Sequence, residues 1–238
     1  MGTPGYAAVL IDVVDSRHHL DRESLQRSLT EAAAVVEVAH PALDPFTPTV
    51  GDELQATYAT VVSAMVAAID LRLRLTGVAE IRTAIGWGDI IVHDPDRTPF
   101  GQDGPAWWAA RTALDEMDAA TVRSSYPARM RLAGIESDAA GVVHTPDPPP
   151  SSRELPAPTE LAIPAAAALR ALTTLLDRSL ATLDATEAAI VLGDRHGAST
   201  AEIARRVGLT ASAVSQRRGR NHLREIVVAL DQLEGIRT

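Results

Sequence analysis

Residues 199–220, STAEIARRVGLTASAVSQRRGR, are the stretch from which the organisation of the chain is best understood. Thr200 can cap a first helix, and Glu202 then lies in its first turn, where a carboxylate favours the helix dipole. Gly208 can end that helix because glycine tolerates a positive φ, and Thr210 can cap a second helix. Two short helices around a tight turn are typical of a helix-turn-helix, whose second helix enters the major groove of DNA.

The second helix has a predicted DNA-reading face. With Val214 as its buried position, residues two positions away, such as Gln216, point toward solvent. Glutamine suits adenine, and arginine suits guanine or phosphate. Val214 and Leu223 are nine residues apart, half a turn out of phase on an ideal helix, so we expect a kink or break at Gly219. The residues expected to contact DNA are Thr210, Ser212, Ala213, Ser215, Gln216, Arg217, Arg218 and Arg220.

Charge is distributed unevenly along the chain. The net charge is −9, yet residues 195–224 hold seven arginines against one acid, Glu202. That stretch therefore carries +6 and the remainder −15. A basic module on an acidic body is typical of a DNA-binding protein with a separate regulatory domain.

Length and composition allow one large domain or a domain with a small module. The chain has 238 residues, of which 46% are hydrophobic, enough for a buried core. It has no cysteine, which excludes disulfides and thiolate metal sites. No apolar run approaches the roughly 18 residues of a membrane span, and no secretory signal precedes the first strand. We therefore expect a cytoplasmic protein without a membrane partner.

The N-terminal part alternates strand-like and helix-like segments. Residues 6–14 form a short apolar run, which predicts a strand buried on both faces. The β-α-β-β-α-β-β-α-β order predicts a ferredoxin-like α/β sandwich. The later elements are expected as a helix over 22–39, a hairpin of 46–50 and 54–58, a helix over 59–76, strands over 81–87 and 89–93, a helix over 106–119 and a strand over 130–135.

A proline-rich segment marks the predicted domain boundary. Residues 144–160 hold six prolines, which indicates a semi-rigid linker between an α/β domain over 1–143 and an all-α domain over 161–238. The fold class is therefore expected to be α+β, with the helix-turn-helix inside a C-terminal bundle. A helix over 165–183 carries leucines at spacings of three and four, which we expect to pack within the module or across a dimer: Leu169, Leu172, Leu176, Leu180 and Leu183.

Two carboxylates in the N-terminal part are candidates for chemistry. Asp12 lies inside the first strand, a costly place for a carboxylate unless it is paired or binds a cation. Asp52 lies at the tip of the expected hairpin, so both could converge on one hard cation such as Mg²⁺. The alternative is that Asp12 caps a loop and Asp52 serves the turn.

Four blocks of the N-terminal part resemble the SatD family, which also ends in a helix-turn-helix. That family's N-terminal block is similar to class III nucleotidyl cyclases, and more distantly to GGDEF-type cyclases, so the resemblance implies a cyclase-like sandwich. It also implies that Asp12 and Asp52 are metal ligands and that Arg111 stabilises charge on a bound triphosphate. The four blocks are VLIDVVDSR (9–17), TVGDELQ (49–55), IRTAIGWGDI (81–90) and DGPAWWAARTAL (103–114).

The chain departs from the cyclase pattern at two positions. Trp107 stands where those enzymes have an asparagine, and Asp15 stands where a glycine lets phosphates approach. These departures favour a degenerate site that binds Mg²⁺ or a nucleotide without turnover, since binding needs fewer aligned groups than phosphoryl transfer. Trp107 and Trp108 open a helix and are interpreted as a core or dimer-interface anchor, with a stacking platform for a base as the alternative.

The leading hypothesis is a cytoplasmic transcription regulator that binds double-stranded DNA as a homodimer. Its cyclase-like domain would serve for dimerisation and nucleotide sensing rather than catalysis. The alternative is a Mg²⁺-dependent enzyme of nucleotidyl cyclase type with an accessory DNA-binding module. A protein-interaction module similar to a sigma-factor domain is the third interpretation.

Overall fold

The first strand, β1 (Gly2–Val13), runs through the centre of the sheet on which the N-terminal part is built. Its side chains alternate between two buried faces, with Val9 and Ile11 on one and Ala8 and Leu10 on the other. A strand covered on both faces explains why this segment is apolar at nearly every position. The structure, a computed structural model, describes residues 2–16, 21–49, 52–97, 99, 101–121, 128–134, 157 and 159–236.

The main sheet has the order β2-β3-β1-β4-β7, with β2 (Asp44–Pro48), β3 (Glu53–Tyr58), β4 (Ile81–Gly88) and β7 (Met130–Ala133). β1 is antiparallel to β3 and β4, β2 is antiparallel to β3, and β7 joins β4 in parallel. The order β2-β3-β1-β4, with a helix after β1 and another after β3, is the ferredoxin-like arrangement that the element order predicted. β8 (Thr159–Ala162) pairs with the first residues of β1.

One predicted strand is wrong in its extent. Within residues 89–93 only β5 (Ile91–Val92) is a strand, and it pairs with β6 (Gln102–Asp103) in a separate small sheet. The chain leaves the main sheet after β4 because the carbonyl of Asp89 accepts the backbone N–H of Ala106, at the start of the next helix, at 3.2 Å. That carbonyl therefore cannot continue the strand ladder.

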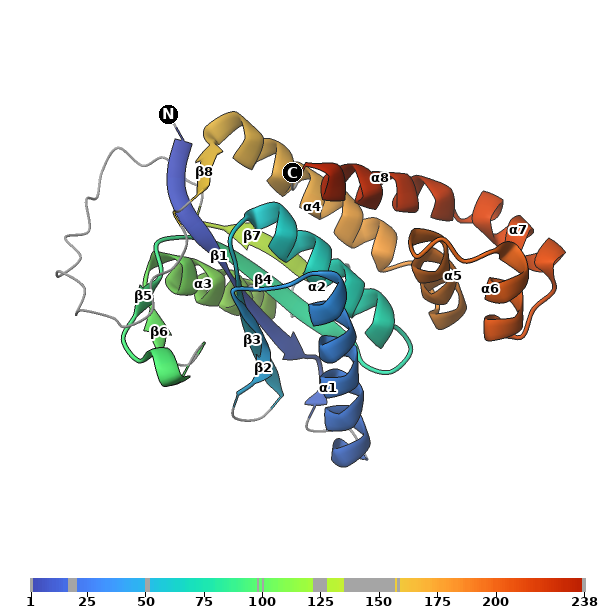
Figure 1. The fold of residues 1–238 in the computed structure, drawn as a ribbon, viewed down its shortest axis with the longest axis horizontal. Helices are drawn as coiled ribbons and strands as arrows, with labels where there is room; N and C mark the ends of the chain where they lie inside the picture. Colours follow the sequence, from blue (N-terminus) through green and yellow to red (C-terminus); the bar gives the residue numbers. More distant parts are fainter. Residues whose placement is uncertain are drawn as a thin grey trace.

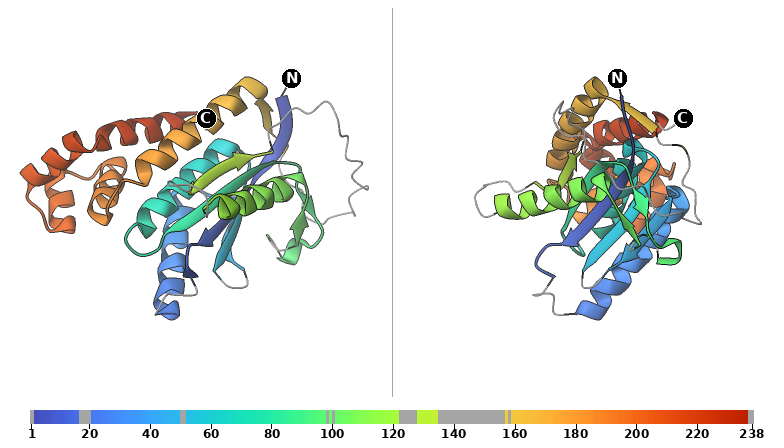
Figure 2. Two further views of the ribbon diagram at one scale, coloured as in Figure 1. Left: turned by 180° about the vertical axis from the view of Figure 1, so that it is seen from behind. Right: turned by 90° about the vertical axis from the view of Figure 1, so that its left-hand side faces the viewer.

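Helices cover both faces of the main sheet (Figures 1 and 2). α1 (Arg22–Ala39) and α2 (Val61–Leu75) share the hydrophobic core on one face, and α3 (Pro105–Thr121) packs on the other. α2 is buried along nearly its whole length because C-terminal helices cover the side that faces away from the sheet. All three helices lie where the periodicity predicted them, and α1 has the predicted bounds.

α3 lies very close to β4 at Gly86. A Cβ at this position would lie 1.9 Å from the carbonyl oxygen of Ala106 and 2.5 Å from the backbone nitrogen of Ala110. Only glycine leaves room for the helix backbone, so Gly86 sets the distance between α3 and the sheet.

The C-terminal part consists of five helices: α4 (Ile163–Leu180), α5 (Ala185–Arg195), α6 (Thr200–Val207), α7 (Ala211–Arg220) and α8 (Leu223–Gly235). One hydrophobic cluster runs from the sheet through α2 into these helices, reaching Ile190 and Leu230. The predicted leucine stripe packs inside the chain, where Leu169, Leu176, Leu180 and Leu183 are buried in this cluster. Beside the stripe, Arg72 of α2 donates to Asp177 of α4 at 2.5 Å.

A buried polar network joins the two parts. Asp70 of α2 has no exposed surface, and its Oδ2 lies 3.2 Å from His40 Nε2 and 3.3 Å from Arg74 Nη2. Burial raises the pKa of Asp70, but the hydrogen bond with His40 and the charge of Arg74 lower it more, so it lies below the ordinary value. His40 Nδ1 lies 3.5 Å from Glu234 of α8, which extends the network into the C-terminal helices.

The predicted linker, residues 144–160, lies for the most part outside the described residues, and its last two belong to β8. Among the helices that the structure describes, none combines the length and hydrophobicity of a membrane span.

Candidate nucleic-acid interface

The cap of α6 is Ser199, not Thr200 as predicted. Ser199 Oγ accepts the backbone N–H of Glu202 at 3.3 Å, and Glu202 Oε2 accepts the backbone N–H of Ser199 at 2.8 Å. This reciprocal pair is a capping box, and the hydrogen bonds from Ser199 lower the pKa of Glu202. Ser199 takes the cap because its backbone is extended (φ −64°, ψ 153°), whereas Thr200 is already the first helical residue.

The turn between α6 and α7 has the predicted geometry. Gly208 adopts φ 69° in the left-handed region, which glycine tolerates without strain. The backbone N–H of Leu209 returns to the carbonyl of Ala204 at 2.9 Å and closes the turn. Thr210 Oγ1 accepts the backbone N–H of Ala213 at 3.1 Å and so caps α7. The helix-turn-helix spacing read from the sequence is therefore present in the structure.

α7 presents one buried and one exposed face. Val214 and Arg218, one turn apart, are buried, and Ala213 and Arg217 are half-buried. α6 and α7 lie at one end of the molecule, far from β5 and β6 (Figure 1). The other predicted contact residues are all exposed: Thr210, Ser212, Ser215, Gln216 and Arg220.

Arg218 does not lie on the exposed face, which corrects the expectation that it contacts DNA. Its side chain is only 9% exposed, and its Nε donates to Asp194 Oδ2 at 2.8 Å. Its Nη1 donates to Thr200 Oγ1, also at 2.8 Å. Because Asp194 lies on α5 and Thr200 on α6, Arg218 holds three helices together and points away from the face that would meet a groove.

Arg217 is also engaged within the chain. Its Nη1 lies 2.9 Å from Asp184 Oδ2 and 3.5 Å from Glu187 Oε1, and its side chain is 36% exposed. Asp184 caps α5 and Glu187 belongs to the same capping box. Arg217 therefore braces α7 against the start of α5, although part of its guanidinium stays accessible.

The expected break at Gly219 is wrong. Gly219 lies inside α7, which continues to Arg220. The chain changes direction at His222, which adopts φ 55°, and α8 begins at the buried Leu223. The side-chain amide of Asn221 donates to Glu187 and holds this corner on α5. Val214 and Leu223 therefore lie on separate helices, as their spacing predicted, and α7 ends beside Asn221, which is held on α5, rather than at the glycine.

Four arginines of the basic stretch are exposed: Arg205 and Arg206 on α6, Arg220 on α7 and Arg224 on α8. Within the described part of the chain no ion pair joins any of them to an acid, whereas Arg195, Arg217 and Arg218 pair with Glu234, Asp184 and Asp194. The prediction of DNA contacts omitted Arg205, Arg206 and Arg224. The charge count pointed to them, but only the fold shows that their helices adjoin α7.

Asp12 lies near the end of β1 on the face covered by α3. Its Oδ2 accepts a hydrogen bond from Arg82 Nη2 at 2.6 Å, and Arg82 also pairs with Asp118 of α3. Burial raises the pKa of Asp12, Arg82 lowers it, and Asp52 and Glu53 raise it further, so the pKa lies above the ordinary value. The positive charge beside Asp12 is thus the guanidinium of Arg82.

Arg111 forms a two-point ion pair with Glu53. Its Nη1 and Nη2 lie 2.6 Å and 2.9 Å from the two carboxylate oxygens, and these hydrogen bonds raise the pKa of Arg111. Asp12, Glu53, Arg82 and Arg111 thus form one charged cluster, the Asp12 cluster, and the charge of Asp52 also acts on Asp12. Among the described residues no group of three or more His, Cys, Asp or Glu side chains is arranged to hold a metal ion.

Two residues of this cluster were not predicted from the sequence. Arg82 pairs with Asp12, and Glu53 pairs with Arg111. Both lie directly opposite Asp12, Arg82 on β4 and Glu53 on β3. The signal that could have found them is the strand register, which the strand order and the hairpin length together constrain.

The two tryptophans have different surroundings. Trp107 is 9% exposed and lies in the core between α3 and the sheet, as the anchor interpretation predicted. Trp108 is 46% exposed, and its indole N–H donates to Asp103 at 2.7 Å.

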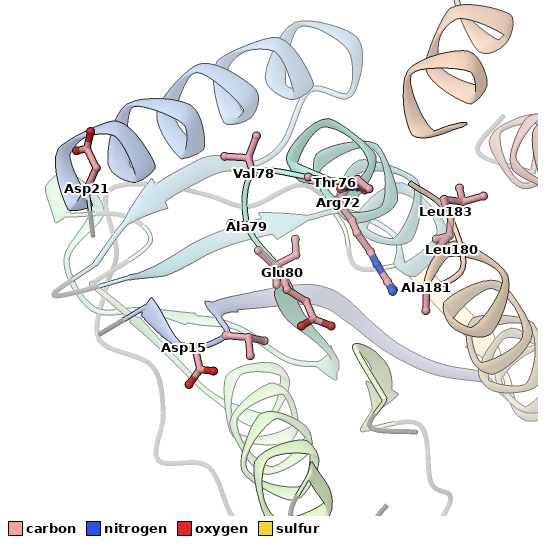
Figure 3. Close-up of a pocket in the computed structure, with 13 residues that line it drawn as sticks. Asp15, Asp21, Arg72, Thr76, Val78, Ala79, Glu80, Leu180, Ala181 and Leu183 are labelled. Carbon is pink, nitrogen blue, oxygen red and sulfur yellow. Dashed lines mark hydrogen bonds between the residues drawn. The ribbon is translucent and has the colours of Figure 1, made fainter. Parts of the chain in front are cut away.

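A hollow of about 860 Å³ lies between the end of β1, the α2–β4 turn and the α4–α5 connection. Figure 3 shows the carboxylates of Asp15 and Glu80 on one side of it and Leu180 and Leu183 on the other. Two of its charged groups have partners in the fold: Glu80 accepts from Arg129 at 2.5 Å, and Asp21 caps α1 by accepting the N–H of Ser24 at 2.8 Å.

Comparison with protein families gives one match. The model of the SatD family matches residues 6–126, slightly more than half of the chain, which include α1, α2 and α3 but not α6 and α7. No curated protein and no solved structure matches the chain.

Proposed function

We propose that this chain, which belongs to the SatD family, is a cytoplasmic transcription regulator that reads double-stranded DNA with α7. The observation that supports this proposal is the exposed face of α7. Ser212, Gln216 and Arg220 lie there at successive helical turns. This face is held outward by a helix-turn-helix with both caps formed, and a helix so presented fits the major groove.

Each exposed residue has a chemical role in this proposal. The Gln216 amide can donate to and accept from one adenine, and the Arg220 guanidinium can donate twice to one guanine. The Ser212 hydroxyl, near the start of α7, suits a base edge or a phosphate. These groups would supply sequence preference.

The exposed arginines outside α7 would supply affinity. Arg205 and Arg206 lie in the last turn of α6 and Arg224 in the first turn of α8, the helices before and after α7. Arginines that neutralise backbone phosphates release condensed counterions, which makes binding depend strongly on salt. Arg218 would act as a positioning residue, because it fixes α7 through α5 and α6 and does not reach the groove.

For the N-terminal part we propose sensing rather than catalysis. The Asp12 carboxylate already has the Arg82 guanidinium as its counter-charge, and Arg111 is held by Glu53. A nucleotide or Mg²⁺ at Asp12, Asp52 and Arg111 would have to displace these ion pairs. Such an exchange would break contacts that Arg111 and Asp118 of α3 make with the sheet, which is a change that a regulator can use.

The test is the salt dependence of binding to a mixed-sequence DNA duplex, followed by fluorescence anisotropy. Replacing Arg205, Arg206 and Arg220 together by alanine should weaken binding at least about tenfold at low salt and lower the slope of log affinity against log salt by about 3. Selection from a random duplex pool should then yield a preferred site for the wild-type chain, and Gln216→Ala should relax that preference at one position.

The matched control replaces three exposed arginines elsewhere, Arg27, Arg97 and Arg131, by alanine. It changes the net charge equally but should leave the salt slope unchanged. Equal losses in the two triple variants would mean that binding follows net charge alone, and the proposal for α7 would fail.

A further inference from the structure

The three arginines of α7 differ in how firmly the chain holds them. Arg218 is buried and Arg220 is exposed, whereas Arg217 is half-buried. The two ion pairs of Arg217 with described residues are both made by Nη1, which lies 2.9 Å from Asp184 Oδ2 and 3.5 Å from Glu187 Oε1. A guanidinium carries five N–H donors on three nitrogens, so these two acids engage only part of it.

The two acids keep other hydrogen bonds when Arg217 leaves. Asp184 Oδ1 accepts the backbone N–H of Glu187 at 2.8 Å, and Glu187 Oε2 accepts the backbone N–H of Asp184 at 3.1 Å. Glu187 Oε1 also accepts from the side-chain amide of Asn221. The Asp184 side chain is 54% exposed, so water can solvate its other oxygen. Release of Arg217 therefore leaves no buried carboxylate oxygen of this pair without a donor, and an ion pair of this kind costs little to break.

Arg218 is the opposite case. Its guanidinium donates to Asp194 from two nitrogens, and the Asp194 side chain is only 17% exposed. Withdrawing Arg218 would leave a largely buried carboxylate without its counter-charge, which costs far more than exposing one that water already reaches. Of the two paired arginines of α7, Arg217 is therefore the one that a new partner can recruit.

Arg217 also lies beside the proposed reading face. It follows Gln216 directly and precedes Arg220 by three positions, which makes Arg217 and Arg220 neighbours on the helix surface. The oxygens of a DNA phosphate suit a guanidinium as well as carboxylate oxygens do. A phosphate close to the reading face can therefore take the place of the two acids at Arg217.

We propose that Arg217 contacts a backbone phosphate and that Asp184 and Glu187 hold its guanidinium until DNA is bound. This role rests on the proposed DNA function. Binding requires an exchange in which Arg217 leaves the two carboxylates, so the ion pair restrains the affinity for DNA. Because a phosphate contact carries no sequence information, the restraint acts on affinity and leaves the preferred site unchanged.

The variant that tests the restraint is Asp184→Asn in the full chain. Asparagine caps a helix as well as aspartate does, so α5 keeps its N-terminal cap while Arg217 loses its closer partner. Binding to a mixed-sequence duplex, followed by fluorescence anisotropy, should become about two- to fivefold tighter, which corresponds to the usual strength of an exposed ion pair. Selection from a random duplex pool should return the same preferred site as for the wild-type chain.

The matched control is Asp21→Asn. Asp21 caps α1 as Asp184 caps α5, and its Oδ1 accepts the backbone N–H of Ser24 at 2.8 Å. The change in net charge is the same, but α1 covers the sheet of the N-terminal part, so the affinity for DNA should stay unchanged. An equal gain in both variants would mean that net charge alone sets the affinity, and the proposal would fail.

Arg217→Ala shows whether the gain passes through this arginine. The variant should bind less tightly, with the slope of log affinity against log salt lowered by about 1. Adding Asp184→Asn to Arg217→Ala should give no further gain, since no ion pair remains to be released. A gain of the same size with and without Arg217 would show that Asp184 only repels DNA, which overturns the proposal. Weaker binding by Asp184→Asn overturns it too, because the ion pair would then be a brace that DNA binding needs.

A measurement without DNA separates this proposal from the DNA function. In urea unfolding, the effects of Asp184→Asn and Arg217→Ala on the unfolding equilibrium constant should depart from additivity by about two- to fivefold. Additive effects overturn the restraint even where the wild-type chain binds DNA. Coupled effects with an unchanged DNA affinity of Asp184→Asn also overturn it and leave the DNA function intact. If neither the wild-type chain nor Asp184→Asn binds the duplex at low salt, the DNA function itself fails, and the phosphate contact fails with it.

Discussion

The Asp12 cluster and the α6–α7 region both concentrate charge, but they use it differently. Near the end of β1, the two basic groups of the cluster are held by acids of the same chain: Arg82 by Asp12 and Asp118, and Arg111 by Glu53. Around α7, the buried Arg218 is paired, while arginines such as Arg220 face solvent.

The identity of a charged residue therefore says little about whether its side chain is available to bind a ligand. Asp12, Asp52 and Arg111 are the residues that the family resemblance assigned to a nucleotide site, yet Asp12 and Arg111 form ion pairs within the chain. On α7, Arg218 and Arg220 are two positions apart, yet one is buried and the other is exposed. Which charged groups can meet a ligand is decided by burial and pairing, and the following predictions test that contrast.

The largest expected effect concerns two glycines, Gly86 beside α3 and Gly219 in α7. Gly86→Ala should destabilise the chain by about 3 kcal/mol, because the new Cβ would overlap the backbone of α3 and force the helix from the sheet. Gly219→Ala should instead stabilise by roughly 0.5–1 kcal/mol, since Gly219 is helical and a Cβ added there would meet no atom within 4 Å. Urea unfolding measures both, and similar effects at the two sites would contradict the tight docking of α3.

The next effect separates two of the arginines of α7, Arg218 and Arg220. Arg218→Ala should cost about 3 kcal/mol of unfolding free energy, because it leaves the Asp194 carboxylate without its partner. Arg220→Ala should change stability by less than about 0.5 kcal/mol while weakening DNA binding. Chemical denaturation together with anisotropy gives both quantities. An Arg218→Ala chain of undiminished stability would show that Arg218 does not hold the three helices together.

A smaller effect is expected in the pH dependence of stability, where Asp70 and Asp12 should act in opposite directions. The pKa of Asp70 lies below the ordinary 3.8, so its carboxylate stabilises the fold above pH 3.8 and that stability is lost as pH falls through the folded pKa. The pKa of Asp12 lies above 3.8, so its contribution is present below pH 3.8 and is lost as pH rises through the folded pKa.

Unfolding free energies measured from acid to neutral pH should show this contrast. Asp70→Asn should remove a component that rises with pH, and Asp12→Asn should remove one that falls. Slopes that change in the same direction for both variants would contradict the assigned shifts.

Much of the fold was predictable because its signals are local. The apolar periodicity placed α1, α2 and α3, and the element order indicated the ferredoxin-like sheet. The errors arose where distant segments decide. The strand predicted over 89–93 was shortened by a contact with the start of α3, and the break expected at Gly219 moved to His222 because Asn221 packs on α5.

The candidate site likewise has features that the sequence predicts and features that depend on contacts between distant segments. The helix-turn-helix follows from the sequence alone, since Gly208 and Thr210 act on backbone groups within a few residues of themselves. In contrast, only the folded chain shows which charged side chains are paired with one another. Arg82 reaches Asp12 across 70 residues and Arg218 reaches Asp194 across 24, and such pairs depend on strand register and helix packing rather than on local pattern. Caps and turns are short-range and can be read from neighbours, whereas the matching of charges is a property of the assembled chain.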